Sequence, residues 1–146
     1  MIYTLRVISI LFVAMAMIPA GAHLFSMGSK LQLGGADYLV SQRAYDGWDM
    51  FAFVIVGTLI STLSLTVASY HAGEPFTLPG VSFLCLVAAQ TLFWTLTFPA
   101  NRATADWVAL PDGWEMLRRQ WEYSHAASAV LNALALLLLV LTSTRH

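Results

Sequence analysis

The sequence predicts an all-α fold, a bundle of four transmembrane helices with two longer loops on one face. Hydrophobic residues make up 58% of the 146 residues and charged residues 10%, whereas a soluble domain carries about 25% charged residues. The charges leave four uncharged runs, at 7–29, 50–73, 75–101 and 123–144. Each run can cross a hydrocarbon core about 30 Å thick as a helix, and none alternates like a barrel strand. We therefore expect a single integral membrane domain over 1–146.

The first span is expected at about 7–28. The same segment also resembles a secretory signal, because Arg6 precedes an apolar stretch and Ala20-Gly21-Ala22 has the composition of a cleavage site. The apolar run continues through Phe25, which is long for the apolar region of a signal sequence. We therefore interpret the segment as a membrane helix whose last turns are kinked at Pro19.

The other three spans are expected at about 48–70, 80–99 and 113–142. The last helix would be about 43 Å long at 1.5 Å per residue, so its first turns extend beyond the membrane. The second connection is a short turn with Pro75, Pro79 and two glycines. The first and third connections, at about 30–46 and 100–112, are longer. They lie on one side of the membrane, since an even number of crossings separates them.

The phrase Asp-Gly-Trp occurs twice, at 46–48 and 112–114, each time before an apolar run. An acidic residue follows each aspartate at the third position, Asp49 after Asp46 and Glu115 after Asp112. This is the spacing of a capping box in which aspartate is the N-cap. We expect both phrases to begin helices, with the tryptophans at the headgroup layer. Internal duplication is the alternative explanation of the repeat.

One face of the last span carries a stripe of polar side chains. Its members are spaced by four, three, three and four residues, namely Arg118, Glu122, His125, Ser128 and Asn132. Exposing these groups to hydrocarbon costs several kcal/mol, so we expect the stripe to face the inside of the bundle.

Other spans offer polar groups at a similar depth. His23 lies near the end of the first span, and the third span carries Gln90, Trp94, Asn101 and Arg102 along one side. We expect His23 and His125 to lie at one level beneath the long loops. His71 is expected at the opposite face and His146 at the terminus, so both fall outside this cluster.

Over about 98–132 the sequence resembles the anthrone oxygenase-like family of small four-helix membrane proteins. The stretch reads FPANRATADW and then PDGWEMLRRQWEYSHAASAVLNAL, and GAHLF at 21–25 is similar to one bacterial branch of the family. The family carries a Pro-x-Asn motif at the end of its third helix. At the start of its fourth helix it carries a tryptophan, then an arginine or tryptophan four positions later, and then a histidine. The matching residues here are Pro99, Asn101, Trp114, Arg118, Trp121 and His125. Characterised members oxidise an anthrone to an anthraquinone with O₂.

The resemblance implies an oxygenase that uses no cofactor and acts on an anthrone-like or hydroxyaromatic substrate. His125 is the candidate general base, and Arg118 or Arg102, with Asn101, would hold the oxyanion. His125, Arg118 and Asn101 are therefore the candidate catalytic residues. The candidate substrate-binding residues are His23, Trp94, Arg102, Trp114, Trp121 and Glu122.

Two other functions are alternatives. The first alternative is a non-enzymatic membrane protein, an accessory subunit or a module that binds a lipid or quinone. The minor alternative is a bundle that binds haem or a metal ion through His23 and His125. Glu122-x-x-His125 has the spacing found in di-iron bundles, but no other acidic residue lies inside a span, so we expect no di-metal centre. The lone Cys85 excludes an intrachain disulfide and a Cys-x-x-Cys pair.

The expected location is a bacterial inner membrane, with the bilayer and a hydrophobic aromatic or quinone-like molecule as partners. A net charge of −1 gives no reason to expect nucleic acid. The long-loop side carries five of the seven basic residues, against Arg6 and Arg145 on the other side. This count places the long loops in the cytoplasm, whereas Arg6 before the first span favours the reverse. The oligomeric state does not follow from the sequence.

Overall fold

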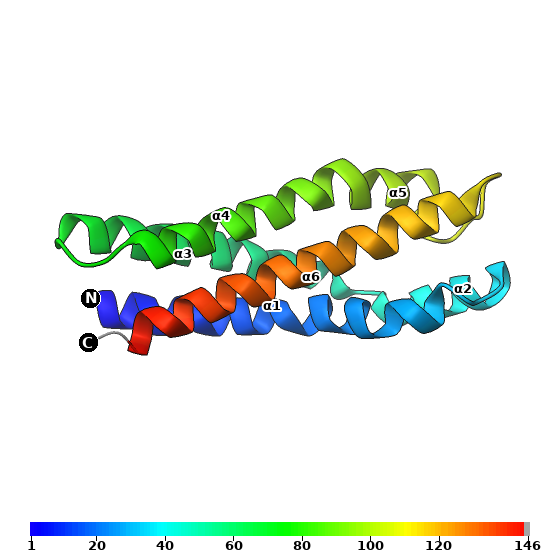
Figure 1. The fold of residues 1–146 in the computed structure, drawn as a ribbon. Helices are drawn as coiled ribbons and strands as arrows, with labels where there is room; N and C mark the ends of the chain where they lie inside the picture. Colours follow the sequence, from blue (N-terminus) through cyan, green and yellow to red (C-terminus); the bar gives the residue numbers. More distant parts are fainter. Residues whose placement is uncertain (145–146) are drawn as a thin grey trace.

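The computed structural model describes residues 1–144, so Arg145 and His146 lie outside the described residues. Four long helices run side by side (Figure 1), namely α1 (Ile2–Lys30), α3 (Phe51–His71), α4 (Thr77–Leu92) and α6 (Trp114–Thr144). Helices α1 and α4 each pack against both α3 and α6. Residues 1–144 contain no strand. The predicted all-α bundle is confirmed.

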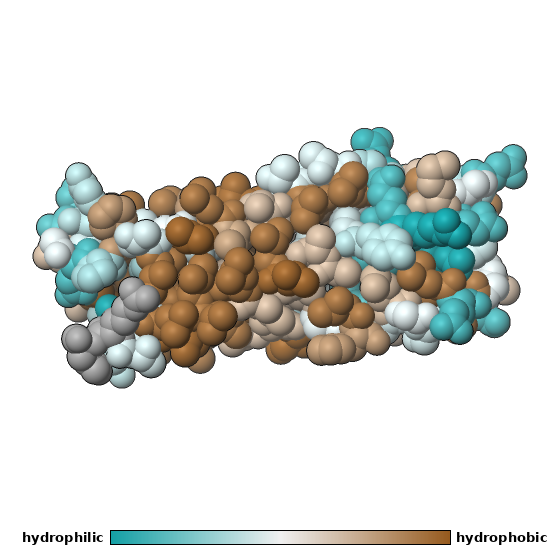
Figure 2. All heavy atoms as spheres, viewed as in Figure 1, coloured by the Kyte–Doolittle hydropathy of each residue, from teal (hydrophilic) through white to brown (hydrophobic). Residues whose placement is uncertain are grey.

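Four segments are long and apolar enough to cross a membrane. They are Ile2–Lys30, Trp48–His71, Thr77–Ala103 and Trp114–Thr144. Hydrophobic side chains cover the middle of the molecule and hydrophilic ones gather at both ends (Figure 2). Large apolar side chains such as Phe53 and Leu84 point outward, 83% and 62% exposed. A surface of this kind is stable in contact with lipid, so the chain is an integral multi-pass membrane protein.

The third span is not one uniform helix. After α4, a π-helical turn at Phe93–Thr97 leads into α5 (Phe98–Ala103). Pro99 lies at the start of α5 and has no amide hydrogen, and its ring would clash with the carbonyl four residues earlier in a regular helix. A π-helical turn relieves that clash. The carbonyl of Leu96 in the widened turn accepts a hydrogen bond from Gln120 Nε2 at 2.8 Å, which ties the turn to α6.

The first long connection contains a helix that the sequence did not predict. This helix, α2 (Gly35–Gln42), is followed by two short 3-10 turns, Arg43–Tyr45 and Trp48–Met50. It lies at the loop end of the bundle (Figure 1). Tyr38 of α2 has no exposed surface, which shows that the connection packs as part of the core at this end.

The two Asp-Gly-Trp phrases fold in the same way. Gly47 and Gly113 both adopt the left-handed conformation, with φ of +80° and +75°. In each case the amide three residues later donates to the glycine carbonyl, from Met50 at 3.4 Å and from Met116 at 3.0 Å. Only glycine adopts this conformation without a steric cost, so the repeated glycine has a structural reason.

The predicted capping boxes are wrong. The residue before the turn at Trp48–Met50 is Gly47, and no side chain caps that turn or α3. Among the hydrogen bonds of residues 1–144, none is accepted by the carboxylate of Asp46 or Asp112. The left-handed glycine places each aspartate one residue farther from the helix than an N-cap, so its carboxylate does not reach the first free amides.

The half of the bundle near the termini has an apolar core. Its buried members are Val13, Leu65, Cys85, Leu86, Ala135 and Leu139. Among its buried hydroxyls, Thr142 bonds to the carbonyl of Leu138 on its own helix, and Ser82 bonds to the carbonyl of Ala135 on α6. His71 lies at this end and is exposed, as expected. The polar stripe of α6 therefore meets its partners at the other end, beneath the long connections.

Candidate functional site

Two histidines from the first and last helices form the centre of the candidate site. The rings of His23 on α1 and His125 on α6 stack with centroids 4.0 Å apart and planes 25° apart, and we call them the histidine pair. Trp121 meets both rings edge-on, at 4.8 Å from His23 and 4.3 Å from His125. His23 is 7% exposed, and its buried Nδ1 has no hydrogen-bond partner within residues 1–144. His125 keeps part of its surface exposed.

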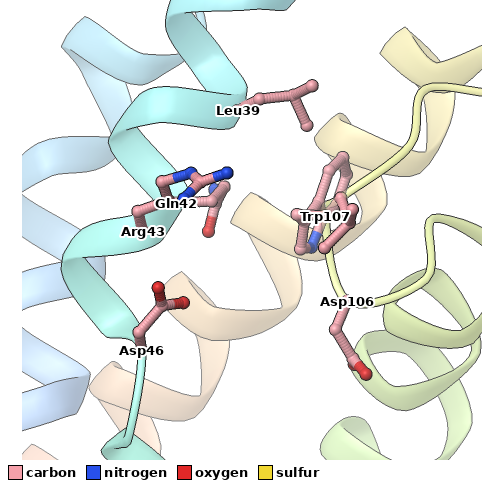
Figure 3. Close-up of a pocket in the computed structure, with 7 residues that line it drawn as sticks. Leu39, Gln42, Arg43, Asp46, Asp106 and Trp107 are labelled. Carbon is pink, nitrogen blue, oxygen red and sulfur yellow. The ribbon is translucent and has the colours of Figure 1, made fainter.

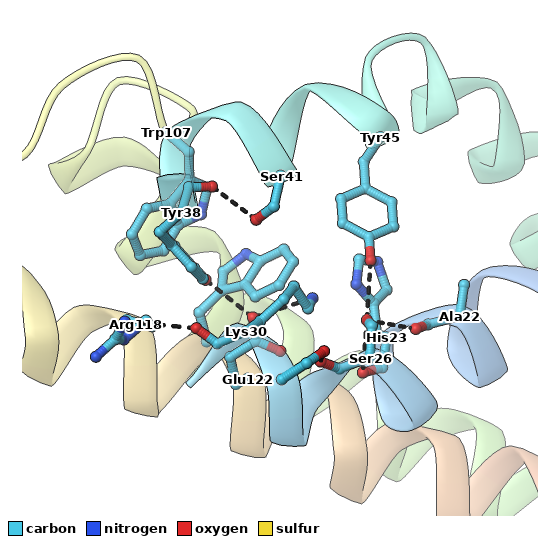
Figure 4. Close-up of polar contacts among 12 residues, drawn as sticks. Ala22, His23, Ser26, Lys30, Tyr38, Ser41, Tyr45, Trp107, Arg118 and Glu122 are labelled. Atoms are coloured by element: carbon cyan, nitrogen blue, oxygen red, sulfur yellow. Dashed lines mark hydrogen bonds and ion pairs between the residues drawn. The ribbon is translucent and has the colours of Figure 1, made fainter. Parts of the chain in front are cut away.

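A buried ion pair lies beside the histidine pair. Lys30 Nζ is 3.0 Å from Glu122 Oε1, and the two side chains are 5% and 0% exposed. The hydroxyl of Tyr38 donates to the same carboxylate oxygen at 3.0 Å (Figure 4). Removing either partner would leave a buried charge uncompensated, which is costly inside a protein. Lys30 and Glu122 therefore fasten α1 to α6.

Tyr38 remains a hydrogen-bond donor over the whole physiological pH range. Burial raises the pKa of the Tyr38 hydroxyl, and the neighbouring carboxylate of Glu122 raises that pKa further. Its ring packs edge-on against Trp107 at 5.0 Å. The tyrosine thus links α2 and the third connection to the buried carboxylate on α6.

The ammonium group of Lys30 also faces two aromatic rings. It lies 4.9 Å from the ring centroid of Tyr45 and 4.9 Å from that of Trp121. A cation over an aromatic face is attracted by the negative charge density of the ring, and more strongly where water is excluded. Lys30 is therefore held by one carboxylate and two rings.

Arg118 is engaged with the first connection. It is 8% exposed, and its Nη1 donates to the carbonyl of Leu33 at 2.7 Å. Its guanidinium lies 4.6 Å from the ring centroid of Trp114 and 5.4 Å from that of Tyr38. These contacts attach the chain between α1 and α2 to the start of α6.

Asn101 joins two tryptophans. Its Oδ1 accepts hydrogen bonds from Trp121 Nε1 at 2.6 Å and from Trp107 Nε1 at 3.2 Å. An indole N–H buried without an acceptor would cost free energy, so one amide oxygen stabilises both rings. The Pro-x-Asn motif thus orients the aromatic walls of the site.

The third connection places Trp107 through an unusual backbone conformation. Ala105, Asp106 and Trp107 all have left-handed φ values, of 49°, 55° and 62°. This conformation costs roughly 1–2 kcal/mol per non-glycine residue. The hydroxyl of Thr104 accepts a hydrogen bond from the amide of Trp107 at 3.1 Å. Trp107 is 5% exposed, and its burial against the other rings compensates part of that cost.

Seven of the nine predicted site residues belong to this end of the molecule and contact one another or share neighbours. They are His23, Asn101, Trp114, Arg118, Trp121, Glu122 and His125. Trp94 lies elsewhere, because it is 60% exposed and packs against Phe93 and Phe98 on the outer surface. Arg102 is exposed, and no ion pair or side-chain hydrogen bond of residues 1–144 involves it.

The sequence analysis did not identify Lys30, Tyr38, Tyr45 or Trp107 as members of the site. For Lys30 a signal was available, since it follows His23 by seven positions, two helical turns, and therefore lies on the same face. Tyr38, Tyr45 and Trp107 lie in the connections, where no helical periodicity predicts which side chains point inward.

Two clefts lie at the loop end of the molecule. One cleft, of about 160 Å³, lies between the first and third connections (Figure 3) and is lined by Leu39, Gln42, Arg43, Asp46, Asp106, Trp107 and Val108. The other is an open apolar groove of about 320 Å³ between α4 and α6, with Arg119 at its edge. Neither lining includes His23, Asn101, Arg118 or His125, whose side chains contact other protein groups.

The histidine pair is not arranged like a pair of metal ligands. An imidazole binds a metal ion along a nitrogen lone pair in the plane of its ring, whereas these rings lie face to face. Within residues 1–144, no three His, Cys, Asp or Glu side chains gather closely enough to hold an ion. The geometry therefore does not favour the haem or metal alternative.

No family model, curated protein or solved structure matches this chain in the comparisons made. The resemblance to the anthrone oxygenase-like family therefore remains a prediction from the sequence.

Proposed function

We propose that the chain is a membrane enzyme that removes a proton from an anthrone-like or hydroxyaromatic substrate, whose anion then reacts with O₂. The observation that carries the proposal is the histidine pair, stacked at 4.0 Å in an aromatic cluster with the buried cation Lys30. A proton acceptor next to a fixed positive charge favours formation of an organic anion. The resemblance to the anthrone oxygenase-like family supports the choice of substrate.

The proposed reaction balances without a further reactant. The methylene carbon of an anthrone lies between two aromatic rings and opposite a carbonyl, so loss of one proton gives a delocalised anion. This anion transfers electrons to O₂ and forms a carbon–oxygen bond. The methylene carbon loses both hydrogens and gains one oxygen atom, and the second oxygen atom leaves as water. Anthrone and O₂ thus give an anthraquinone and water.

The roles of the side chains follow from their contacts. His125 is the candidate base because the residue keeps part of its surface exposed, and His23 stacks on its face with an unpartnered Nδ1. Arg118 and Asn101 were predicted to hold the oxyanion. Their hydrogen bonds to Leu33 and to the two indoles instead support positioning roles, in which they hold the walls of the cluster.

The test is O₂ uptake by the purified protein in detergent with an anthrone as substrate. We expect uptake with anthraquinone formation, and a roughly 10²- to 10⁴-fold lower rate in His125→Ala, as for the loss of a general base. The matched control is His71→Ala at the other end of the bundle, which should keep the full rate. Uptake no faster than the spontaneous reaction would reject the proposal.

One observation favours a second candidate function. The side chains of the cluster contact one another, and neither cleft is lined by the histidine pair. The same cluster would then pack the helices of a non-enzymatic protein, either an accessory subunit or a module that binds a lipid or quinone-like molecule elsewhere. Tight binding of an anthraquinone without any anthrone oxidation would support this candidate over the enzyme.

A further inference from the structure

The aromatic cluster already holds a phenol, the side chain of Tyr45. Its ring centroid lies 4.2 Å from that of His23, at an angle of 39°. The ammonium of Lys30 lies 4.9 Å from the same ring. Trp48 packs edge-on at 5.1 Å, and Trp121 lies at 6.3 Å (Figure 4 shows Tyr45 beside His23 and Ser26). One phenolic ring thus lies among a histidine, a buried cation and two tryptophans.

The hydroxyl of Tyr45 also has a defined partner. It lies 3.1 Å from Ser26 Oγ, and Ser26 directs its own hydrogen to the carbonyl of Ala22 at 2.6 Å. Because the serine hydrogen is used there, the tyrosine hydroxyl is the donor in its contact with Ser26. The site therefore supplies an acceptor for a phenolic O–H and a cation for the face of the ring. These are the groups that a hydroxyaromatic ligand needs.

We propose that Tyr45 occupies the position of the phenolic ring of the ligand, and that a hydroxyaromatic molecule binds by displacing it. The identity of the ligand rests on the proposed function, whereas the position of the ring is derived from the contacts of Tyr45. A ring in this place packs on the face of His23, and His23 stacks in turn on His125.

Tyr45 is the member of the cluster that can leave at the smallest cost. It ends the 3-10 turn Arg43–Tyr45 in a connection, keeps part of its surface exposed, and makes one side-chain hydrogen bond. The left-handed Gly47 follows two residues later and is exposed. Trp121 and Lys30, in contrast, are buried on long helices. Exposed connections are the parts of a fold that open most readily.

Displacement of Tyr45 accounts for the absence of the histidine pair from both clefts, because the protein's own side chain fills the site. It also gives Lys30 a role. Its Nζ has no hydrogen-bond partner within residues 1–144 beyond the ion contact with Glu122, so it has donor capacity to spare. A ligand ring that has lost its phenolic proton is held more strongly by this ammonium than a neutral one.

The experiment measures binding of 1,8-dihydroxyanthraquinone, whose visible absorption changes when a hydroxyl ionises, to the full chain in detergent micelles. Tyr45→Ala should bind the dye roughly ten-fold or more tightly, because the competing ring is gone. Tyr45→Phe keeps the ring and should bind much less tightly than Tyr45→Ala. Tyr70→Ala, which removes an exposed tyrosine at the opposite end, is the matched control and should leave binding unchanged. Equal or weaker binding by Tyr45→Ala would overturn the inference.

A second readout is the pH at which the bound dye changes colour. In Tyr45→Ala, bound dye should ionise at a lower pH than dye in empty micelles, because Lys30 attracts the anion. Adding Lys30→Met together with Glu122→Gln removes the cation without leaving a lone charge, and should abolish the shift. A shift that persists would overturn the role of Lys30. Tight dye binding without anthrone oxidation would reject the proposed enzyme and leave this inference standing, whereas oxidation with unchanged dye binding in Tyr45→Ala would reject the inference alone.

Discussion

The two ends of the bundle are built from different kinds of contact. Near the termini, Arg6 pairs with Glu74 at 3.7 Å at the surface, with side chains 20% and 46% exposed. At the loop end, Lys30 and Glu122 pair at 3.0 Å with side chains 5% and 0% exposed. The interior of the first end consists of apolar side chains and a few hydroxyls, without a buried ion pair among the described residues.

The loop end carries the desolvation cost of a buried ion pair, which the stability of the fold alone does not require. Replacing a buried ion pair by apolar residues of similar size is often neutral or stabilising. Ionisable groups inside membrane proteins are accordingly a default indication of a functional site. The contrast between the two ends therefore supports a binding or catalytic role for the loop end.

The largest expected effect comes from breaking the buried pair. Glu122→Ala leaves the ammonium of Lys30 without its carboxylate, and we expect a loss of about 3–5 kcal/mol in the free energy of unfolding. Unfolding by SDS titration in mixed micelles measures it. Lys30→Met combined with Glu122→Leu should cost much less than either single change. If Glu122→Ala lost less than about 1 kcal/mol, the buried pair would not distinguish the two ends.

A comparable loss, with a lower minimum, is expected at Asn101. Asn101→Leu removes the acceptor of two indole N–H groups, which at about 1–3 kcal/mol for each buried unsatisfied donor predicts a loss of roughly 2–6 kcal/mol. The emission of the tryptophans should shift as well. The control is Asn132→Leu, since Asn132 bonds to the carbonyl of Ser128 on its own helix. Equal losses in both variants would contradict the role of Asn101 as the link between the rings.

Alkaline pH should weaken the loop end through Tyr38. A tyrosine of the unfolded chain ionises near pH 10, whereas burial raises the pKa of Tyr38 in the folded protein. Above about pH 10 the folded state thus binds one more proton, so stability falls by about 1.4 kcal/mol per pH unit. SDS titrations between pH 9 and 11 measure this slope. Tyr38→Phe should reduce it, and an unchanged slope would mean that Tyr38 ionises in the folded state.

The smallest effect is expected at the end near the termini. Arg6→Gln should change the free energy of unfolding by no more than about 0.5 kcal/mol, because an ion pair at the surface is largely screened by water and salt. The change should also vanish at high ionic strength. A salt-dependent loss above about 1 kcal/mol would show that charges stabilise both ends, and would weaken the contrast.

The span prediction succeeded because lipid constrains a backbone strongly. Uncharged runs of sufficient length have to become helices, and the stripe from Arg118 to Asn132 has to turn inward, whatever the details of packing. The same physical reasoning predicted that His23 and His125 lie at the same depth in the bundle, and their rings are stacked in the structure. These inferences needed periodicity and charge, which the sequence displays directly.

The sequence could not predict the parts of the site that depend on tertiary contacts. Lys30 follows the uncharged run at 7–29, a position typical of the end of a membrane span. Its burial depends on the ion pair with Glu122, which is distant in the sequence. Trp107 points inward because three non-glycine residues adopt left-handed conformations, for which the sequence has no signal. Tyr38 lies on an eight-residue helix, too short for its periodicity to stand out. The prediction of aspartate N-caps was wrong because Gly47 and Gly113, which follow the aspartates, adopt the left-handed conformation next to the helical turn.

The contact between Lys30 and Glu122 has a further consequence for biogenesis. It joins α1 to α6, which is synthesised later, so no intermediate that lacks α6 can form this pair. Until α6 is made, the ammonium of Lys30 has to stay at the aqueous boundary or bind another partner. The buried position of Lys30 on α1 is therefore conditional on the presence of α6.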